Sequence, residues 1–135
     1  MNHREDVLRW FPPGDPAHMS IDNNQGLLYK LSGNYEEAKR LFEKTLPAYQ
    51  AIYGDEHAKT INVLINLGAV LKDLQEFEKA VEVFEKAIEG RLKTDGESST
   101  GYMMAKAMAA GAYRDMGQYD KADEYLRDAY LQCSL

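Results

Sequence analysis

Apolar residues along much of the chain recur at steps of three and four positions, which places them on one face of an α-helix. One such stretch runs from Leu64 to Leu74, and a second runs from Phe77 to Ile88. Alternation of apolar and polar residues, the pattern of a half-buried β-strand, does not extend beyond a few positions. The pattern therefore predicts an all-α protein built from amphipathic helices.

The helical pattern repeats every 42 residues, so that equivalent positions form columns of similar side chains. In the first column the residue numbers rise from 29 to 71 to 113, and three further columns keep the same step. A fixed step of this length over three copies is typical of a helical-repeat protein, and each copy reads as two helices joined by a tight turn. The columns are Tyr29, Leu71 and Tyr113; Tyr35, Phe77 and Tyr119; Ala38, Ala80 and Ala122; and Phe42, Phe84 and Leu126.

The tight turn inside each copy needs a residue in the left-handed backbone conformation. Gly33 and Gly117 lie there in the first and third copies, and glycine adopts this conformation without a steric cost. Gln75 lies there in the second copy, so we expect this turn to be more strained. Small residues also recur where the two helices of a copy face each other, which lets their backbones approach closely. They are Gly26, Gly68 and Ala110, facing Ala38, Ala80 and Ala122.

Helix start signals agree with this division. Asp15 followed by Pro16 is typical of an N-cap residue with proline at the first helical position. We expect Asp55, and then Ser98 or Ser99, to cap the equivalent helices of the later copies.

Length and charge exclude several classes of protein. A chain of 135 residues fits one domain, and its 16 basic and 22 acidic residues give a net charge near −6. Nucleic acids and anionic membranes both require a basic face, so we expect neither as a partner. No run approaches the roughly 18 apolar residues of a membrane span, and the N-terminus lacks the apolar core of a signal peptide.

The residues that carry chemistry in enzymes and metal sites form no recognisable cluster. Cys133 is the one cysteine, which excludes an internal disulfide and fits a reducing, cytoplasmic compartment. His3, His18 and His57 lie far apart, and no glycine-rich phosphate loop or nucleophile elbow is present. We therefore expect no catalytic residue, no metal site and no cofactor.

The columns resemble the tetratricopeptide repeat family. That family has a period of about 34 residues, whereas the longer period here, with Tyr53-Gly54-Asp55 leading into the Leu67-Gly68 pair, is similar to the kinesin-light-chain type. The resemblance covers about residues 14–133, and it implies a right-handed α–α superhelix of about three hairpins. The second copy matches the family pattern at Leu64, Leu67, Gly68, Leu71, Phe77, Ala80, Phe84 and Ala87.

We divide the chain into repeats at residues 14–53, 54–95 and 96–135. Residues 1–13, which include Trp10 and Phe11, resemble the tail of a second helix and are predicted to be the remnant helix of a preceding hairpin. No polar capping helix follows residues 122–135, although repeat stacks usually need one. Either the chain is a piece of a longer protein, which we favour, or another chain covers an end. Apolar residues at both ends would then allow weak end-to-end self-association.

The family resemblance implies that the first helices line a concave groove in which peptides bind. In the family, the residue before the pair equivalent to Leu67-Gly68 points into this groove. This repeat position holds Asn24, Asn66 and Met108. Asn62 and Met104, one helical turn earlier, extend the same face. Asparagine both donates and accepts hydrogen bonds, so it can hold a peptide backbone without requiring one sequence. The alternative to peptide binding is that the asparagines only form a solvated polar face and that the methionines are packed in the core.

A second column on the same helices holds cations. Lys30, Lys72 and Arg114 would form a positive strip suited to a ligand with acidic residues, because opposite charges steer association. The alternative is that these exposed cations are neutralised by the neighbouring Asp73 and Asp115. Both interpretations stay open.

Some co-chaperones of the family hold a terminal carboxylate with a clamp of lysines, asparagines and an arginine. Of those groups this sequence matches only Asn66, because Asn23, Leu27, Met104 and Met108 stand at the other positions. We therefore expect no such clamp. The predicted function is a protein–protein interaction module with a scaffold or adaptor role; the alternative is a repeat piece that self-assembles through uncapped ends.

Overall fold

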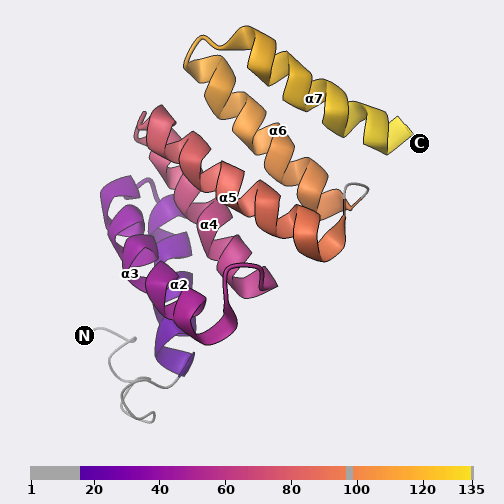
Figure 1. Ribbon diagram of the computed structural model, residues 1–135. Helices are drawn as coiled ribbons and strands as arrows, with labels where there is room; N and C mark the ends of the chain where they lie inside the picture. The colour runs from indigo at the N-terminus through magenta and orange to yellow at the C-terminus, as the bar shows by residue number, and fades with distance from the viewer. Residues whose placement is uncertain (1–15, 97–98, 135) are drawn as a thin grey trace.

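The computed structural model describes residues 16–96 and 99–134, with side chains described at 19–96 and 99–127. These residues form a succession of α-helices joined by short connections (Figure 1). The predicted remnant helix at residues 1–13 and the predicted N-cap Asp15 lie outside the described residues. The helices are α2 (Pro16–Leu31), α3 (Tyr35–Tyr53), α4 (Ala58–Asp73), α5 (Phe77–Asp95), α6 (Thr100–Asp115) and α7 (Tyr119–Ser134).

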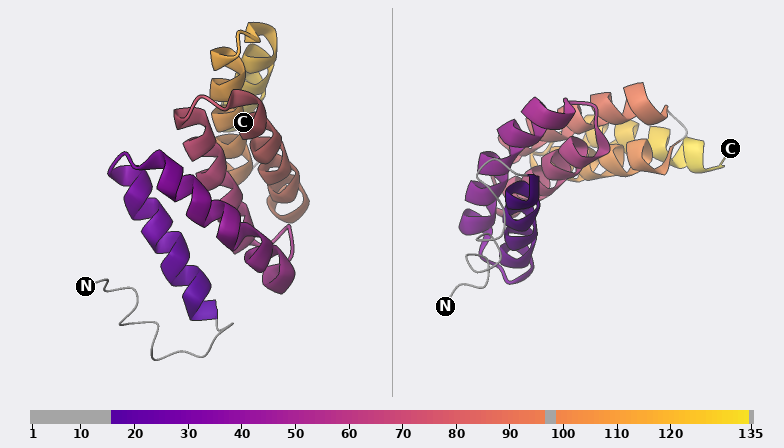
Figure 2. Two further views of the ribbon diagram at one scale, coloured as in Figure 1. Left: turned by 90° about the vertical axis from the view of Figure 1, so that its left-hand side faces the viewer. Right: turned by 90° about the horizontal axis from the view of Figure 1, so that it is seen from below.

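Each helix packs against the next one in the sequence, from α2 to α7. The first helices also contact one another, α2 with α4 and α4 with α6, whereas no such contact joins the described parts of α3, α5 and α7. Elements on the inside of a curved stack lie closer together than those on the outside, so the first helices line the concave side. Figure 2 shows the resulting bend in its right-hand view. The predicted all-α superhelix is confirmed.

The core of each of the first two hairpins is a phenylalanine ring placed against a glycine. Phe42 and Phe84 are fully buried. A Cβ atom added to Gly26 would lie 2.8 Å from the ring of Phe42, and one added to Gly68 would lie 2.6 Å from the ring of Phe84. The small residues on the first helices are thus required mainly by these rings, at the close-packed density typical of protein interiors.

The turn at Gln75 adopts the conformation that the sequence predicts. Gly33 and Gly117 have φ angles of +86° and +82°, and Gln75 has a φ of +64° at the equivalent place. Among the described residues Gln75 is the one non-glycine with a positive φ, a region in which a side chain bearing a Cβ is strained.

One predicted helix cap is wrong. Because α4 begins at Ala58, the residue directly before it is His57, whose Nδ1 accepts a hydrogen bond from the Lys59 backbone N–H at 3.1 Å. Asp55 lies too far from the helix to cap it. The predicted cap Ser99 is confirmed, since its Oγ accepts from the Tyr102 N–H at 3.1 Å.

Candidate peptide-binding groove

One face of each first helix stays accessible on the concave side. On α4, the residues that pack against α3 and α5 are buried, and the remaining residues recur at steps of three and four. The same division is found on α6, whereas on α2 the equivalent residues are accessible but Leu28 and Leu31, outside this set, are exposed as well. We call this accessible set the inner stripe: Asn24, Leu27 and Lys30 on α2; Asn62, Ile65, Asn66, Ala69 and Lys72 on α4; and Met104, Ala107, Met108, Gly111 and Arg114 on α6.

The predicted asparagines and methionines differ in how far solvent reaches them. Asn24, Asn62 and Met104 are exposed, with 58% of Met104 accessible, so core packing does not explain that methionine. Asn66 and Met108 are half-buried, and Met108 also packs against the core. The fold therefore brings all five side chains to one face, with the methionines on the last hairpin.

Asn62 is already partly engaged within the protein. Its Oδ1 accepts a hydrogen bond from Nη2 of Arg91 at 3.3 Å, while Nη1 of Arg91 pairs with Asp95 at 3.2 Å. This contact joins α4 to α5 and fixes the orientation of the Asn62 amide. A ligand would therefore find mainly the amide N–H donors of Asn62, whereas the sequence alone suggested both donors and acceptors.

The three cations of the inner stripe do not form a uniform strip. Nζ of Lys72 lies 3.8 Å from Oδ2 of Asp115, and it would lie 3.1 Å from a Cβ atom added to Gly111. Lys72 thus reaches from α4 across the glycine of α6 to an acid. Lys30 and Arg114 contact no carboxylate among the described side chains. Neutralisation, the alternative considered for this column, applies to Lys72.

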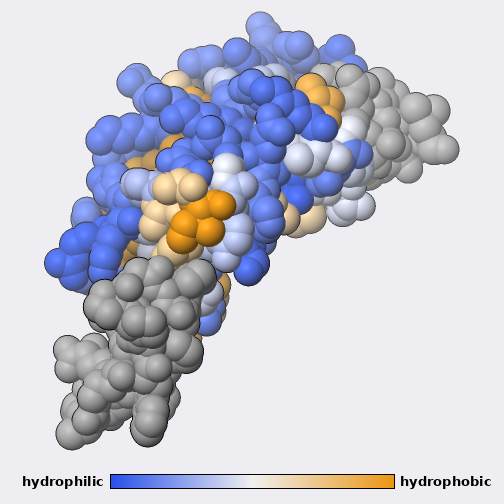
Figure 3. Space-filling view, turned by 60° about the horizontal axis from the view of Figure 1, so that its bottom comes forward, coloured by the Kyte–Doolittle hydropathy of each residue, from blue (hydrophilic) through white to orange (hydrophobic). Residues whose placement is uncertain are grey.

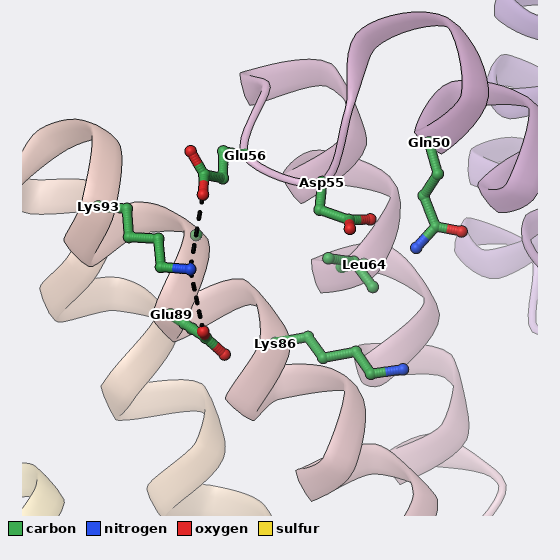
Figure 4. Close-up of a pocket in the computed structure, with 8 residues that line it drawn as sticks. Gln50, Asp55, Glu56, Leu64, Lys86, Glu89 and Lys93 are labelled. Atoms are coloured by element: carbon green, nitrogen blue, oxygen red, sulfur yellow. Dashed lines mark ion pairs between the residues drawn. The ribbon is translucent and has the colours of Figure 1, made fainter.

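A second concavity lies away from the inner stripe. A cavity of about 260 Å³ opens between the ends of α3 and α5 and the connection before α4, with Leu64 at its floor (Figure 4). Nζ of Lys93 pairs with Glu89 at 3.2 Å and with Glu56 at 3.6 Å, and the hydrogen bond to Glu89 raises the pKa of Lys93. Sequence reasoning missed this cavity, because its residues come from three helices and the connection before α4 and share no repeat column.

A group of tyrosines around one carboxylate ties the last hairpin to the middle one. Glu85 on α5 accepts hydrogen bonds from the hydroxyl of Tyr113 at 2.9 Å and from that of Tyr125 at 2.5 Å. The two rings meet edge to face at 5.4 Å. Burial, followed by the bond to Glu85, raises the pKa of Tyr113 to about 12, and the same causes raise the pKa of Tyr125. Both phenols therefore stay protonated and act as donors.

Other kinds of site find little support in the described part of the chain. No group of three His, Cys, Asp or Glu residues within it is placed to hold a metal ion. None of its helices is both long and apolar enough to cross a membrane. The face shown in Figure 3 is largely hydrophilic, and its hydrophobic patches are small and separate.

Comparison with known proteins decides the family. A profile described as tetratricopeptide repeat matches residues 18–93, and a second profile of the same description matches residues 105–131. The chain belongs to the tetratricopeptide repeat family. Tetratricopeptide domains generally bind other proteins and are typically not catalytic.

Curated relatives of this tetratricopeptide array are much longer proteins. The clustered mitochondria protein homolog of Debaryomyces hansenii is 27% identical over 106 residues, which cover 78% of this chain and 8% of that protein. The homolog from Meyerozyma guilliermondii is 27% identical over 111 residues, which cover 82% of this chain and 9% of that protein. The chain thus spans less than a tenth of the length of these relatives.

Several solved structures have the same fold as this tetratricopeptide stack. A kinesin light chain-like protein of Podosopora anserina with nearly identical repeats superposes with a TM-score of 0.83 at 18% identity, covering 97% of this chain and 62% of that one. BtubC from P. vanneervenii gives a TM-score of 0.68 at 17% identity, and the match covers 97% of this chain and 70% of BtubC. The tetratricopeptide domain of Arabidopsis FLU gives a TM-score of 0.76 at 16% identity, and the match covers 86% of this chain and 94% of that domain. At these identities the likeness shows the fold, and the structural neighbours include kinesin light chain-like tetratricopeptide repeats, as the resemblance predicted.

Proposed function

We propose that this tetratricopeptide array is a scaffold or adaptor module that binds a peptide segment of a partner protein along the inner stripe. The observation that carries the proposal is the accessibility of asparagines at one repeat position. Asn24 and Asn66 occupy the same repeat position on α2 and α4, where Asn24 is exposed and Asn66 half-buried, and we infer that both side chains face the groove. Amide side chains at a regular spacing suit the regularly spaced N–H and C=O groups of a peptide backbone.

The two halves of the groove have different roles in this proposal. On α2 and α4 the asparagines hydrogen-bond to the backbone of the ligand, with Asn62 donating because its oxygen is already bonded to Arg91. On α6, Met104 and Met108 contact ligand side chains, since methionine adapts its shape to irregular partners. The groove therefore holds the backbone in one half and selects side chains in the other.

Acidic ligand residues are the expected partners of the cations. Arg114 is exposed and Lys30 half-buried, and neither is paired with an acid among the described side chains. Lys72 must exchange Asp115 for a ligand carboxylate. Opposed charges of this kind mainly accelerate association, whereas desolvated amide contacts mainly lengthen the lifetime of the complex.

The proposal is tested with peptides selected from a random library on the immobilised protein. In surface plasmon resonance, Asn66→Ala should speed dissociation, by an amount equivalent to roughly 1–3 kcal/mol if backbone groups of the ligand are left buried and unpaired. Asn34→Ala is the matched control, because Asn34 is an exposed asparagine in a turn outside the inner stripe. Peptides that bind both variants and the original chain with equal kinetics would place the site elsewhere.

A further inference from the structure

Arg91 occupies a repeat position that a core aromatic residue fills in the first hairpin. Tyr49, 42 residues earlier on α3, is buried, whereas Arg91 on α5 keeps 17% of its side chain accessible. The Nε atom of Arg91 is buried and has no hydrogen-bond partner among the described residues. A buried N–H group without a partner costs free energy. Packing alone therefore does not explain an arginine at this position.

The guanidinium group of Arg91 lies between the first turns of α4 and α6. Its Nη2 donates a hydrogen bond to Oδ1 of Asn62 on α4 at 3.3 Å. A Cβ atom added to Gly101 on α6 would lie 3.0 Å from Nε of Arg91, so this glycine leaves the room that the guanidinium fills. Because Asn62 belongs to the inner stripe, Arg91 is a cation of α5 that reaches the beginning of that stripe.

Lys72 makes the matching contact near the other end of the same two first helices. Its Nζ would lie 3.1 Å from a Cβ atom added to Gly111 on α6. Gly101 and Gly111 lie on one face of α6, since steps of three, four and three residues connect them. On this face each glycine leaves room for one cation from the preceding hairpin.

We propose that Arg91 and Lys72 together bind two acidic residues of an extended segment of a partner protein, which lies along α4 and α6. This inference rests on the proposed function and adds a spacing to it. The two glycines beside the cations are ten residues apart on α6, as are Asn62 and Lys72 on α4. Ten helical residues span about 15 Å, so both helices give the same separation of the two cations along the groove.

This separation fixes the spacing of the acidic residues in the ligand. An extended peptide advances about 3.3–3.6 Å per residue, so four steps cover about 13–14 Å. Side chains four positions apart point to the same side of an extended chain, whereas those three or five apart point to opposite sides. The acidic residues of the ligand are therefore four positions apart. Asn66 lies between the two cations on α4, where its amide faces the backbone of the intervening residues.

Both cations can exchange their internal partners for ligand carboxylates. Nη1 of Arg91 pairs with Asp95 at 3.2 Å, and Nζ of Lys72 lies 3.8 Å from Asp115. Both of these acids are more than one-third exposed, and exposed pairs of this kind contribute little to stability. The guanidinium of Arg91 also has N–H groups on Nη1 and Nη2 beyond the two that bond to Asp95 and Asn62.

The test uses synthetic peptides of serine and threonine, blocked at both ends, with two glutamates placed three, four or five positions apart. Their net charge is the same, so long-range repulsion by the acidic protein affects them equally. Fluorescence anisotropy should show several-fold tighter binding for the spacing of four. The proposal is overturned if the three peptides bind equally, or if none binds more tightly than a version with glutamine at both positions.

A second measurement assigns each cation to one acidic residue. In the peptide with a spacing of four, each glutamate is replaced by glutamine in turn, and binding to Arg91→Met and Lys72→Met is measured. Each variant should lose the preference for glutamate over glutamine at one position only, and the two positions should differ. A residue that only supports the fold would weaken all peptides alike. Lys86→Met is the matched control, because Lys86 is an exposed cation of α5 outside the inner stripe.

The outcomes also separate this proposal from the one on which it rests. If Asn66→Ala weakens binding of every peptide while neither cation variant changes the preference for glutamate, the groove binds peptides without this pair, and the proposal is overturned. If the cation variants behave as expected and Asn66→Ala has no effect, the two cations bind the ligand and the asparagines do not hold its backbone. Circular dichroism checks that all variants keep their helices.

Discussion

At the scale of single residues, the fold depends on how closely the two helices of a hairpin approach. The ring of Phe84 fills the space beside Gly68, and the ring of Phe42 fills the space beside Gly26. Both rings are inaccessible to solvent, so they are confined on all sides. A helical glycine normally costs stability relative to alanine, and here the close contact explains its presence.

Gly68→Ala should therefore destabilise the protein. The new methyl group would lie 2.6 Å from a ring atom that is held in place by its neighbours. Overpacking of this kind costs about 1–3 kcal/mol, which exceeds the gain of up to about 1 kcal/mol from the better helix former. Gly111→Ala is the control, since its methyl group meets only the flexible end of Lys72 and should leave stability unchanged or raise it. Thermal unfolding of both variants decides; equal melting temperatures would refute the packing argument.

At the scale of helices, local periodicity was enough to predict the hairpins, because the residues that define each helix face are three or four positions apart. The glycine turns, the strained Gln75 and the cap at Ser99 follow from the same local chemistry. Contacts between hairpins were not predictable in this way. Glu85 has the spacing of a solvated residue on α5, yet two tyrosines from later helices bond to it.

The contact of Glu85 with these tyrosines should make stability fall at high pH. The pKa of Tyr113 is raised from 10.0 to about 12 in the folded protein, so above pH 10 the unfolded chain loses the proton first. The stabilisation is therefore complete below pH 10 and is lost as the pH rises towards 12.

Tyr125→Phe removes one of the two phenols and should lower stability at neutral pH while weakening this alkaline loss. Tyr119→Phe is the matched control on the same helix, because Tyr119 is exposed. Urea unfolding at a series of pH values would measure both effects. Identical pH profiles for Tyr125→Phe and the original chain would contradict this assignment.

At the scale of the whole molecule, the net charge and the groove act in opposite directions on an acidic ligand. The chain carries a net charge near −6, which repels acidic segments at long range. The cations of the inner stripe attract such segments only locally. The sequence predicted where these cations lie along the chain. It could not show that Lys72 crosses Gly111 to reach Asp115, because that contact depends on how α6 is placed beside α4.

This contact allows the charge hypothesis to be tested by removing an acid. Asp115→Asn deletes the partner of Lys72 and lowers the negative charge beside Arg114, so a selected acidic peptide should associate severalfold faster. Association should also become more sensitive to salt, because screening acts on the attraction between exposed charges. Asp120→Asn makes the same change in net charge on α7, outside the inner stripe, and should have a much smaller effect. Stopped-flow or surface plasmon resonance measurements at several salt concentrations separate the two variants. If both accelerate association equally, the peptide responds only to the net charge of the molecule, and the cations of the inner stripe do not contact it.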